Sequence, residues 1–153
     1  MRSIRTYDLV QNLPALDAEC GPNIRYSLNI SPTQTTNISF MLARLHELST
    51  SGRPERFVLE LTEESFAAVG PFQTHVLPSL RNAEIAISID DFGTGYSSLA
   101  KLAELTVDEL KLDRSLVSSI HERPHNQVIL RAVESLASAL KNKPPVKAIT
   151  EWS

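Results

Sequence analysis

The sequence predicts an α/β fold, a partial (βα)8 barrel of the TIM type with about four to five parallel strands alternating with helices. Two observations predict this class. Short segments that alternate strictly between apolar and polar residues recur along the chain, and segments with apolar residues at helical spacing lie between them. The predicted strands follow one another at intervals of roughly thirty residues, the length that a parallel βαβ unit needs.

The alternating segments are the predicted strands. They are RYSLNIS (Arg25–Ser31), FVLELT (Phe57–Thr62), IAISID (Ile85–Asp90) and the shorter ELKLD (Glu109–Asp113). Each has one face of large apolar residues and one face of small or polar residues. We expect the apolar faces to meet the helices and the other faces to point toward a common centre.

Helices are predicted between and around these strands. An opening helix runs from about Thr6 to Glu19, and a second, from Ile38 to Leu48, ends before Gly52 and Pro54. Further helices are predicted over Phe72–Leu80 with an interruption at Pro78, over Ser97–Leu105, and after Pro124, where the apolar stripe includes Val128, Ile129, Ala132, Val133, Leu136 and Leu140.

Composition narrows the class of protein. A chain of 153 residues suits one domain, which we expect to span residues 1–153. The net charge of −3, with both signs mixed, offers no basic surface for a nucleic acid polymer. No apolar run is long enough to cross a bilayer, and we expect no membrane contact. The single cysteine, Cys20, cannot form an internal disulfide and fits a reducing, cytoplasmic setting.

Polar side chains follow one another at the ends of the predicted strands. Asn29, Glu60, Asp90 and Lys111 lie on the polar faces near the carboxyl ends of their strands, and Asp91 begins the loop after Asp90. In (βα)8 barrels this end carries the chemistry. Carboxylate and amide oxygens suit Mg²⁺, Mn²⁺ or Ca²⁺, and two adjacent aspartates could hold one metal ion each. Such a pair of ions would polarise a phosphate and activate a water.

Four of these residues also have a simpler interpretation. Asn29 could make a turn, and Glu60 could be an exposed strand residue. Lys111 could be a solvated charge or an ion-pair partner, and Asp91 could cap the next helix. The shared position on the polar faces favours a common site over four separate roles.

The segments that carry these residues resemble a known family. ISIDDFGTGYSSL (Ile87–Leu99), followed by VDELKLDRSLV (Val107–Val117), is similar to the EAL domain of bacterial cyclic-di-GMP phosphodiesterases. SLNISP and FVLELTEES match two further blocks of the family in the same order. The resemblance implies a signalling hydrolase that converts cyclic di-GMP to pGpG with two Mg²⁺ or Mn²⁺ ions. It implies metal ligation by the matched residues Asn29, Glu60, Asp90 and Asp91. It also implies a catalytic role for two of the matched residues: Asp91 as the second acid at the metal pair, and Lys111 through contact with the catalytic water.

The chain also departs from the family pattern. The Glu-Ala-Leu segment that names the family is not found, and Ile149 stands where a later ligand glutamate is expected. We therefore expect a domain truncated at both ends and inactive as a phosphodiesterase by itself. The alternative is a non-catalytic module of cyclic-di-GMP signalling that binds the nucleotide or a protein. In either case we expect a homo-oligomer, such as a dimer, that covers the open barrel.

Overall fold

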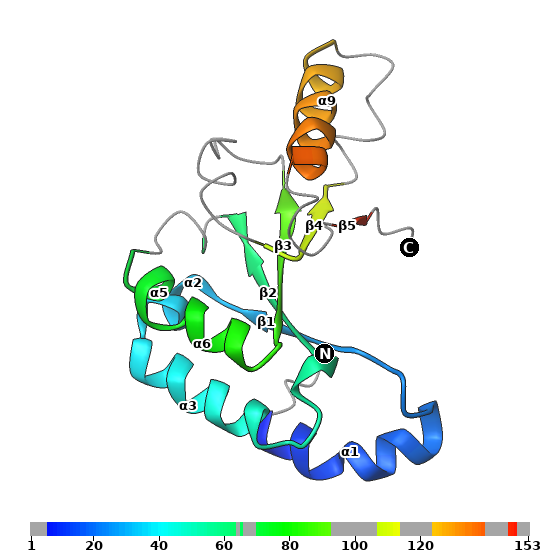
Figure 1. Cartoon of the computed structure of the whole chain (residues 1–153), viewed down its shortest axis with the longest axis vertical. Helices are drawn as coiled ribbons and strands as arrows, with labels where there is room; N and C mark the ends of the chain where they lie inside the picture. Colours follow the sequence, from blue (N-terminus) through cyan, green and yellow to red (C-terminus); the bar gives the residue numbers. More distant parts are fainter. Residues whose placement is uncertain are drawn as a thin grey trace.

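Five parallel strands form a single sheet, in which they lie side by side in chain order (Figure 1). They are β1 (Tyr26–Ile30), β2 (Phe57–Thr62), β3 (Ala86–Phe92), β4 (Glu109–Leu112) and β5 (Lys147–Ile149). Connections between parallel neighbours are right-handed as a rule, so each new strand is added on the same side and the sheet curls toward a barrel. The predicted partial (βα)8 architecture is confirmed.

The computed structural model describes residues 6–63, 65, 70–92, 107–113, 124–139 and 147–149. The helix predicted over 97–105 lies outside these ranges, as does the part of ISIDDFGTGYSSL that follows Phe92. In the described part, no helix is long and apolar enough to span a membrane.

One helix precedes β1, and the others lie in the connections between the strands. They are α1 (Thr6–Cys20), α2 (Pro32–Thr36), α3 (Ile38–Ser49), the short 3₁₀ helix η1 (Pro54–Arg56), α5 (Gly70–His75), α6 (Leu77–Asn82) and α9 (Pro124–Ala139). The segment predicted as one interrupted helix forms two, because Pro78 lies in the first turn of α6, the helical position that tolerates proline. The turn after α6 places Glu84 at a left-handed φ of 60°.

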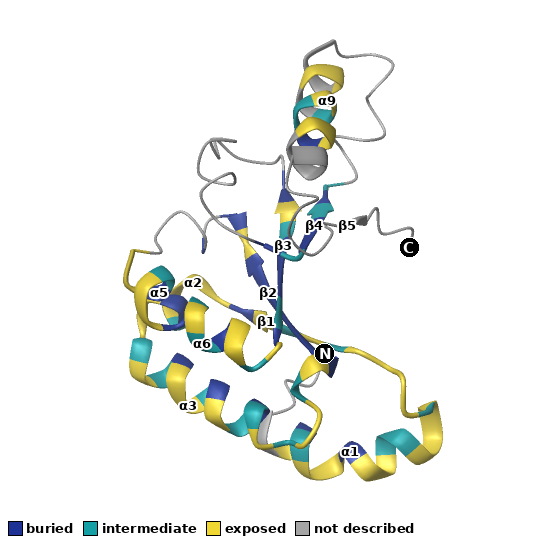
Figure 2. Ribbon diagram, in the orientation of Figure 1, coloured by how far each residue is buried: buried dark blue, intermediate teal, exposed yellow. Residues whose placement is uncertain are grey.

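The core lies between the sheet and the helix layer. Leu59 and Leu61 of β2 and Ile87 and Ile89 of β3 are buried in one cluster with apolar residues of the helices, such as Met41 of α3. Figure 2 shows this contrast, with buried residues along the central strands and exposed residues on the outer surfaces of α1, α3 and α5. The predicted contact between apolar strand faces and helices is confirmed.

One prediction near the end of the chain is corrected, and one strand there was not predicted. The predicted stripe of α9 is confirmed at Val133, which is buried in the core, and is wrong at Val128, which is 64% exposed. Leu130, three residues before Val133 and outside the predicted stripe, packs on the core beside it. The segment Lys147–Ile149 gave no clear strand pattern, yet its backbone pairs with β4 as β5. Three residues are too few for an alternating pattern to be recognised.

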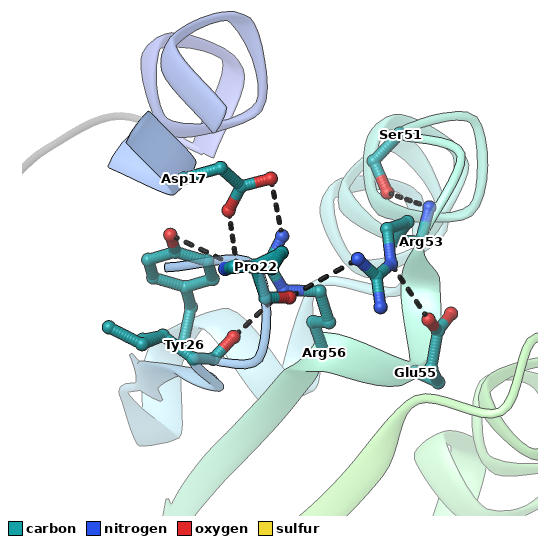
Figure 3. Close-up of polar contacts among 8 residues, drawn as sticks. Asp17, Pro22, Tyr26, Ser51, Arg53, Glu55 and Arg56 are labelled. Carbon is teal, nitrogen blue, oxygen red and sulfur yellow. Dashed lines mark hydrogen bonds and ion pairs between the residues drawn. The ribbon is translucent and has the colours of Figure 1, made fainter. Parts of the chain in front are cut away.

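The buried guanidinium of Arg56 ties α1 to the start of the sheet (Figure 3). Its Nη1 donates to Asp17 Oδ2 at 2.9 Å, and its Nε donates to the Ile24 carbonyl at 2.8 Å. The same group lies 5.1 Å from the centre of the Tyr26 ring. Arg56, the residue before β2, therefore holds α1 and the segment before β1 together. It lies at the end of the sheet away from the polar cluster.

Candidate functional site

The strand pairing places the predicted polar residues in two neighbouring rows on one face of the sheet. Asn29 pairs in register with Glu60, Glu60 with Ser88, and Ser88 with Glu109. Two residues further along β3, Asp90 pairs with Thr62 of β2. Since residues opposite one another in a parallel pair share a face, the side chains of both rows belong to the inner, concave face.

Glu60 and Lys111 form an ion pair that crosses β3. Lys111 Nζ lies 2.7 Å from Glu60 Oε1, and only 12% of the lysine side chain and 6% of the glutamate side chain are exposed. The interpretation of Glu60 as an exposed strand residue is wrong, because neighbouring strands enclose it on both sides. Of the two simpler interpretations of Lys111, a solvated charge or an ion-pair partner, the structure shows the ion-pair partner. The small Ser88 lies between the two strands in the row of Glu60, which leaves room for the bridge.

Asp90 and Asp91 lie where the pairing of β3 with β4 shifts its register, between Ile89 and Phe92. Asp91 has a left-handed φ of 54°, and its backbone N–H donates to Asp90 Oδ1 at 3.0 Å. Burial raises the pKa of the Asp90 carboxyl above its ordinary value of 3.8; the negative charges of Asp91 and Glu60 raise it further, while the Asp91 N–H and the Lys111 charge oppose them. Backbone strain and an unfavourable charge at one point are common features of functional sites.

Asp108 helps to fix the position of Lys111 along β4 relative to β3. Its carboxylate accepts a hydrogen bond from the Ile87 N–H at 2.8 Å, and its own N–H donates to the Ile87 carbonyl at 2.9 Å. These two bonds fix the start of β4 beside β3, three residues before Lys111.

The structure therefore brings Glu60, Asp90 and Lys111 together, with Asp91 next to them and more exposed. Asn29 is adjacent in register to Glu60, and its side chain is exposed at the edge strand. Among the described residues, no three His, Cys, Asp or Glu side chains gather as a ready metal-binding group. The predicted ligand set and the role of Lys111 stay predictions. The predicted ligands offer oxygen donors of the type that binds Mg²⁺ or Mn²⁺.

One ion pair and one buried serine next to these residues were not among the predicted site residues. Arg25 Nη1 lies 2.5 Å from Glu109 Oε1, which joins the residue before β1 to the first residue of β4. Ser88 Oγ is buried and has no hydrogen-bond partner within the described ranges. The sequence carried a signal for the first pair, because Arg25 has the same strand parity as Asn29, and Glu109 the same parity as Lys111.

Comparison with known proteins gives one family. The family model described as "EAL domain" matches residues 4–149. The chain is 35% identical over 123 residues to the cyclic di-GMP phosphodiesterase PdeR of Escherichia coli, a match that covers 78% of this chain. It is 28% identical to the EAL enzyme Bd1971, solved with cAMP and cyclic di-GMP bound, with a TM-score of 0.74 over 97% of this chain. It is 26% identical to BlrP1 of Klebsiella pneumoniae, solved with manganese and cyclic di-GMP, with a TM-score of 0.70 over 96% of this chain.

These matches cover only part of each relative. The aligned segment is 18% of PdeR, 39% of the Bd1971 chain and 36% of the BlrP1 chain.

Proposed function

The chain belongs to the EAL domain family, and from this premise we propose that its polar cluster is part of a site for cyclic di-GMP and divalent metal ions. The observation that carries the proposal is the convergence of Glu60, Asp90 and Lys111 at the carboxyl ends of three neighbouring strands. Their positions combine hydrogen-bonded carboxylates with a cation on one concave face. Such a face suits an anionic phosphodiester held through metal ions.

The residues of the cluster fit a divalent cation. Asn29, Glu60, Asp90 and Asp91 would hold it, since all four offer oxygen ligands. The raised pKa of Asp90 indicates a carboxylate packed where its negative charge lacks full compensation, and a bound cation would supply that compensation. When bound, such an ion polarises a phosphoryl oxygen and lowers the pKa of a coordinated water.

The protein's own groups have separate parts in this proposal. Lys111 holds the Glu60 carboxylate in place and supplies positive charge toward the nonbridging oxygens of the substrate. Asp91, at its left-handed backbone position, presents an exposed carboxylate next to Asp90. Mg²⁺ and Mn²⁺ are the cations we propose.

A second candidate function is binding without hydrolysis. The backbone of Ile149 pairs in register with Lys111, so the β5 position opposite Lys111 carries an aliphatic residue. The resemblance places a ligand glutamate there. We propose that the chain by itself binds the nucleotide and does not hydrolyse it.

Self-association belongs to the same proposal. β1 and β5 are the outermost strands of the described sheet, and an unpaired strand edge is a ready surface for another chain. A second copy that covers these edges would make a dimer, and sedimentation of the purified chain would measure it.

A cytoplasmic location, which the lone Cys20 predicts, is also part of this proposal.

The experiment that tests the site is calorimetric titration with Mn²⁺ and then cyclic di-GMP, followed by chromatography of the same mixture for pGpG. Glu60→Gln removes the central carboxylate charge, and Glu55→Gln serves as a matched control in an exposed ion pair with Arg53. We expect binding that Glu60→Gln abolishes and Glu55→Gln leaves unchanged.

The product analysis separates the two candidates. Formation of pGpG would identify a phosphodiesterase, and binding without pGpG would identify a receptor. Absence of binding in the wild-type protein would overturn both.

A further inference from the structure

A second ion pair lies on the inner face beside the one between Glu60 and Lys111. Arg25 Nη1 and Glu109 Oε1 are 2.5 Å apart, with 43% of the arginine side chain and 8% of the glutamate side chain exposed. Two strands separate β1 from β4, so the contact spans the concave side of the curved sheet. The buried partner is Glu109, whose charge would be costly if Arg25 were absent.

Glu109 is also within reach of Lys111. The two residues share a face of β4 and are two positions apart, a separation of roughly 7 Å between their Cα atoms. In the row below Lys111, Ser88 is flanked by Glu60 on one side and Glu109 on the other. Two buried carboxylates therefore flank the space that the flexible lysine side chain can reach.

We propose that Arg25 is a positioning residue for Lys111. By neutralising Glu109, Arg25 leaves the Lys111 ammonium to Glu60, a carboxylate of the cluster. Without Arg25, the unpaired Glu109 competes for Lys111 and draws it away from the proposed site. The relevance of this role to cyclic di-GMP rests on the proposed function, whereas the role itself concerns only four described side chains and their charges.

The test measures the coupling between Glu60 and Lys111 by a double-mutant cycle in urea denaturation, with Glu60→Gln, Lys111→Met and the double variant. The cycle is run in the wild-type chain, in Arg25→Gln and in Arg25→Gln/Glu109→Gln. We expect the coupling to fall by about half or more in Arg25→Gln and to return when Glu109 is also neutralised. Arg53→Gln, which removes an exposed arginine paired with Glu55, is the matched control and should leave the coupling unchanged.

A merely structural role for Arg25 would lower stability without this pattern. Unchanged coupling in Arg25→Gln would overturn the proposal, and so would a loss that Glu109→Gln does not reverse. If Arg25→Gln is too unstable to measure, the same cycles are run in a Glu84→Gly background. This substitution removes the backbone strain of a glutamate at left-handed φ, away from the site, and should raise the stability enough for the measurement. The cycles contain neither metal nor nucleotide, so failure of the proposed function would leave their outcome intact.

Discussion

Lys111 Nζ reaches Glu60 Oε1 at 2.7 Å from two strands away, above the buried Ser88. Both charges are largely buried. A buried ion pair contributes little net free energy to stability, but loss of one partner leaves the other charge buried without compensation. The pair is therefore a sensitive point of the fold as well as the centre of the proposed site.

Replacement of Lys111 by methionine should lower the free energy of unfolding by about 3 kcal/mol, because it leaves the Glu60 carboxylate buried and unpaired. The double variant Lys111→Met/Glu60→Gln should recover most of this loss. Urea denaturation measures both. Glu47→Gln, in an ion pair with Arg44 on the surface of α3, should cost less than about 0.5 kcal/mol. Equal losses at the two sites would contradict the prediction.

Ser88→Ala should leave the free energy of unfolding unchanged or raise it by up to about 1 kcal/mol, since its buried hydroxyl has no hydrogen-bond partner within the described ranges. Ser65 provides the matched control, because its hydroxyl is equally buried but lies 2.9 Å from the Thr62 hydroxyl. Ser65→Ala should cost about 1 kcal/mol in the same denaturation experiment. A larger loss for Ser88→Ala than for Ser65→Ala would show that Ser88 has a partner.

Glu84→Gly should stabilise the protein by up to about 1 kcal/mol, because the glutamate is held at a φ of 60° that glycine adopts without steric cost. The residue is exposed, so few side-chain contacts are lost. Glu84→Ala keeps the strained conformation and should show no gain. Thermal unfolding of the three proteins checks this, and a gain for alanine equal to that for glycine would refute the conformational explanation.

The pair between Asp17 and Arg56 should make stability depend on acid pH. The hydrogen bond from Arg56 is the main cause that lowers the pKa of Asp17 in the folded protein, with burial opposing it. A lowered folded-state pKa means that the contribution is present above the ordinary aspartate value of 3.8 and is lost as the pH falls from there through the folded value.

Denaturation of the wild type and Asp17→Asn at neutral pH and near pH 3 tests this dependence. The wild type should be the more stable at neutral pH, and the difference should shrink in acid. Glu55→Gln, at an ion pair that is about half exposed on both sides, is the control and should show a smaller effect. A difference that is constant with pH would rule out the linkage.

Ile149→Glu should strengthen Mn²⁺ binding by about tenfold, because it adds a carboxylate to β5 in register with Lys111. Calorimetric titration with Mn²⁺ measures the change. Ala148→Glu, at the adjacent β5 position that pairs with Leu110, is the matched control and should not strengthen binding. Equal effects at the two positions would indicate a general effect of charge.

The sequence pattern predicted the strands well where they alternate over five or more residues. β2 was predicted at its observed bounds, and β3 extends through Asp91 and Phe92, two residues beyond the predicted end. The extension follows from the register shift beside β4, which depends on the partner strand and leaves no mark in the β3 segment itself. β5 was missed for the related reason that its strand conformation is set by pairing with β4.

The candidate site was predictable to the level of which face and which end of the sheet. Strand parity alone grouped Glu60, Asp90 and Lys111, since parity follows directly from backbone geometry. Which charges contact one another was beyond this pattern: the bond between Lys111 and Glu60, and the bond between Arg25 and Glu109, depend on the curvature of the sheet. Curvature brings together residues that are far apart in any flat drawing of the strands.

The chain-order sheet has a consequence for synthesis on the ribosome. Each strand that emerges finds its pairing partner already made and exposed beside it, so the sheet can grow by one unit at a time from the amino terminus. The contact between Arg25 and Glu109 is different, because it joins residues 84 positions apart and needs four strands to be in place. This contact can therefore form only after β4 has been synthesised and the sheet has taken its curvature.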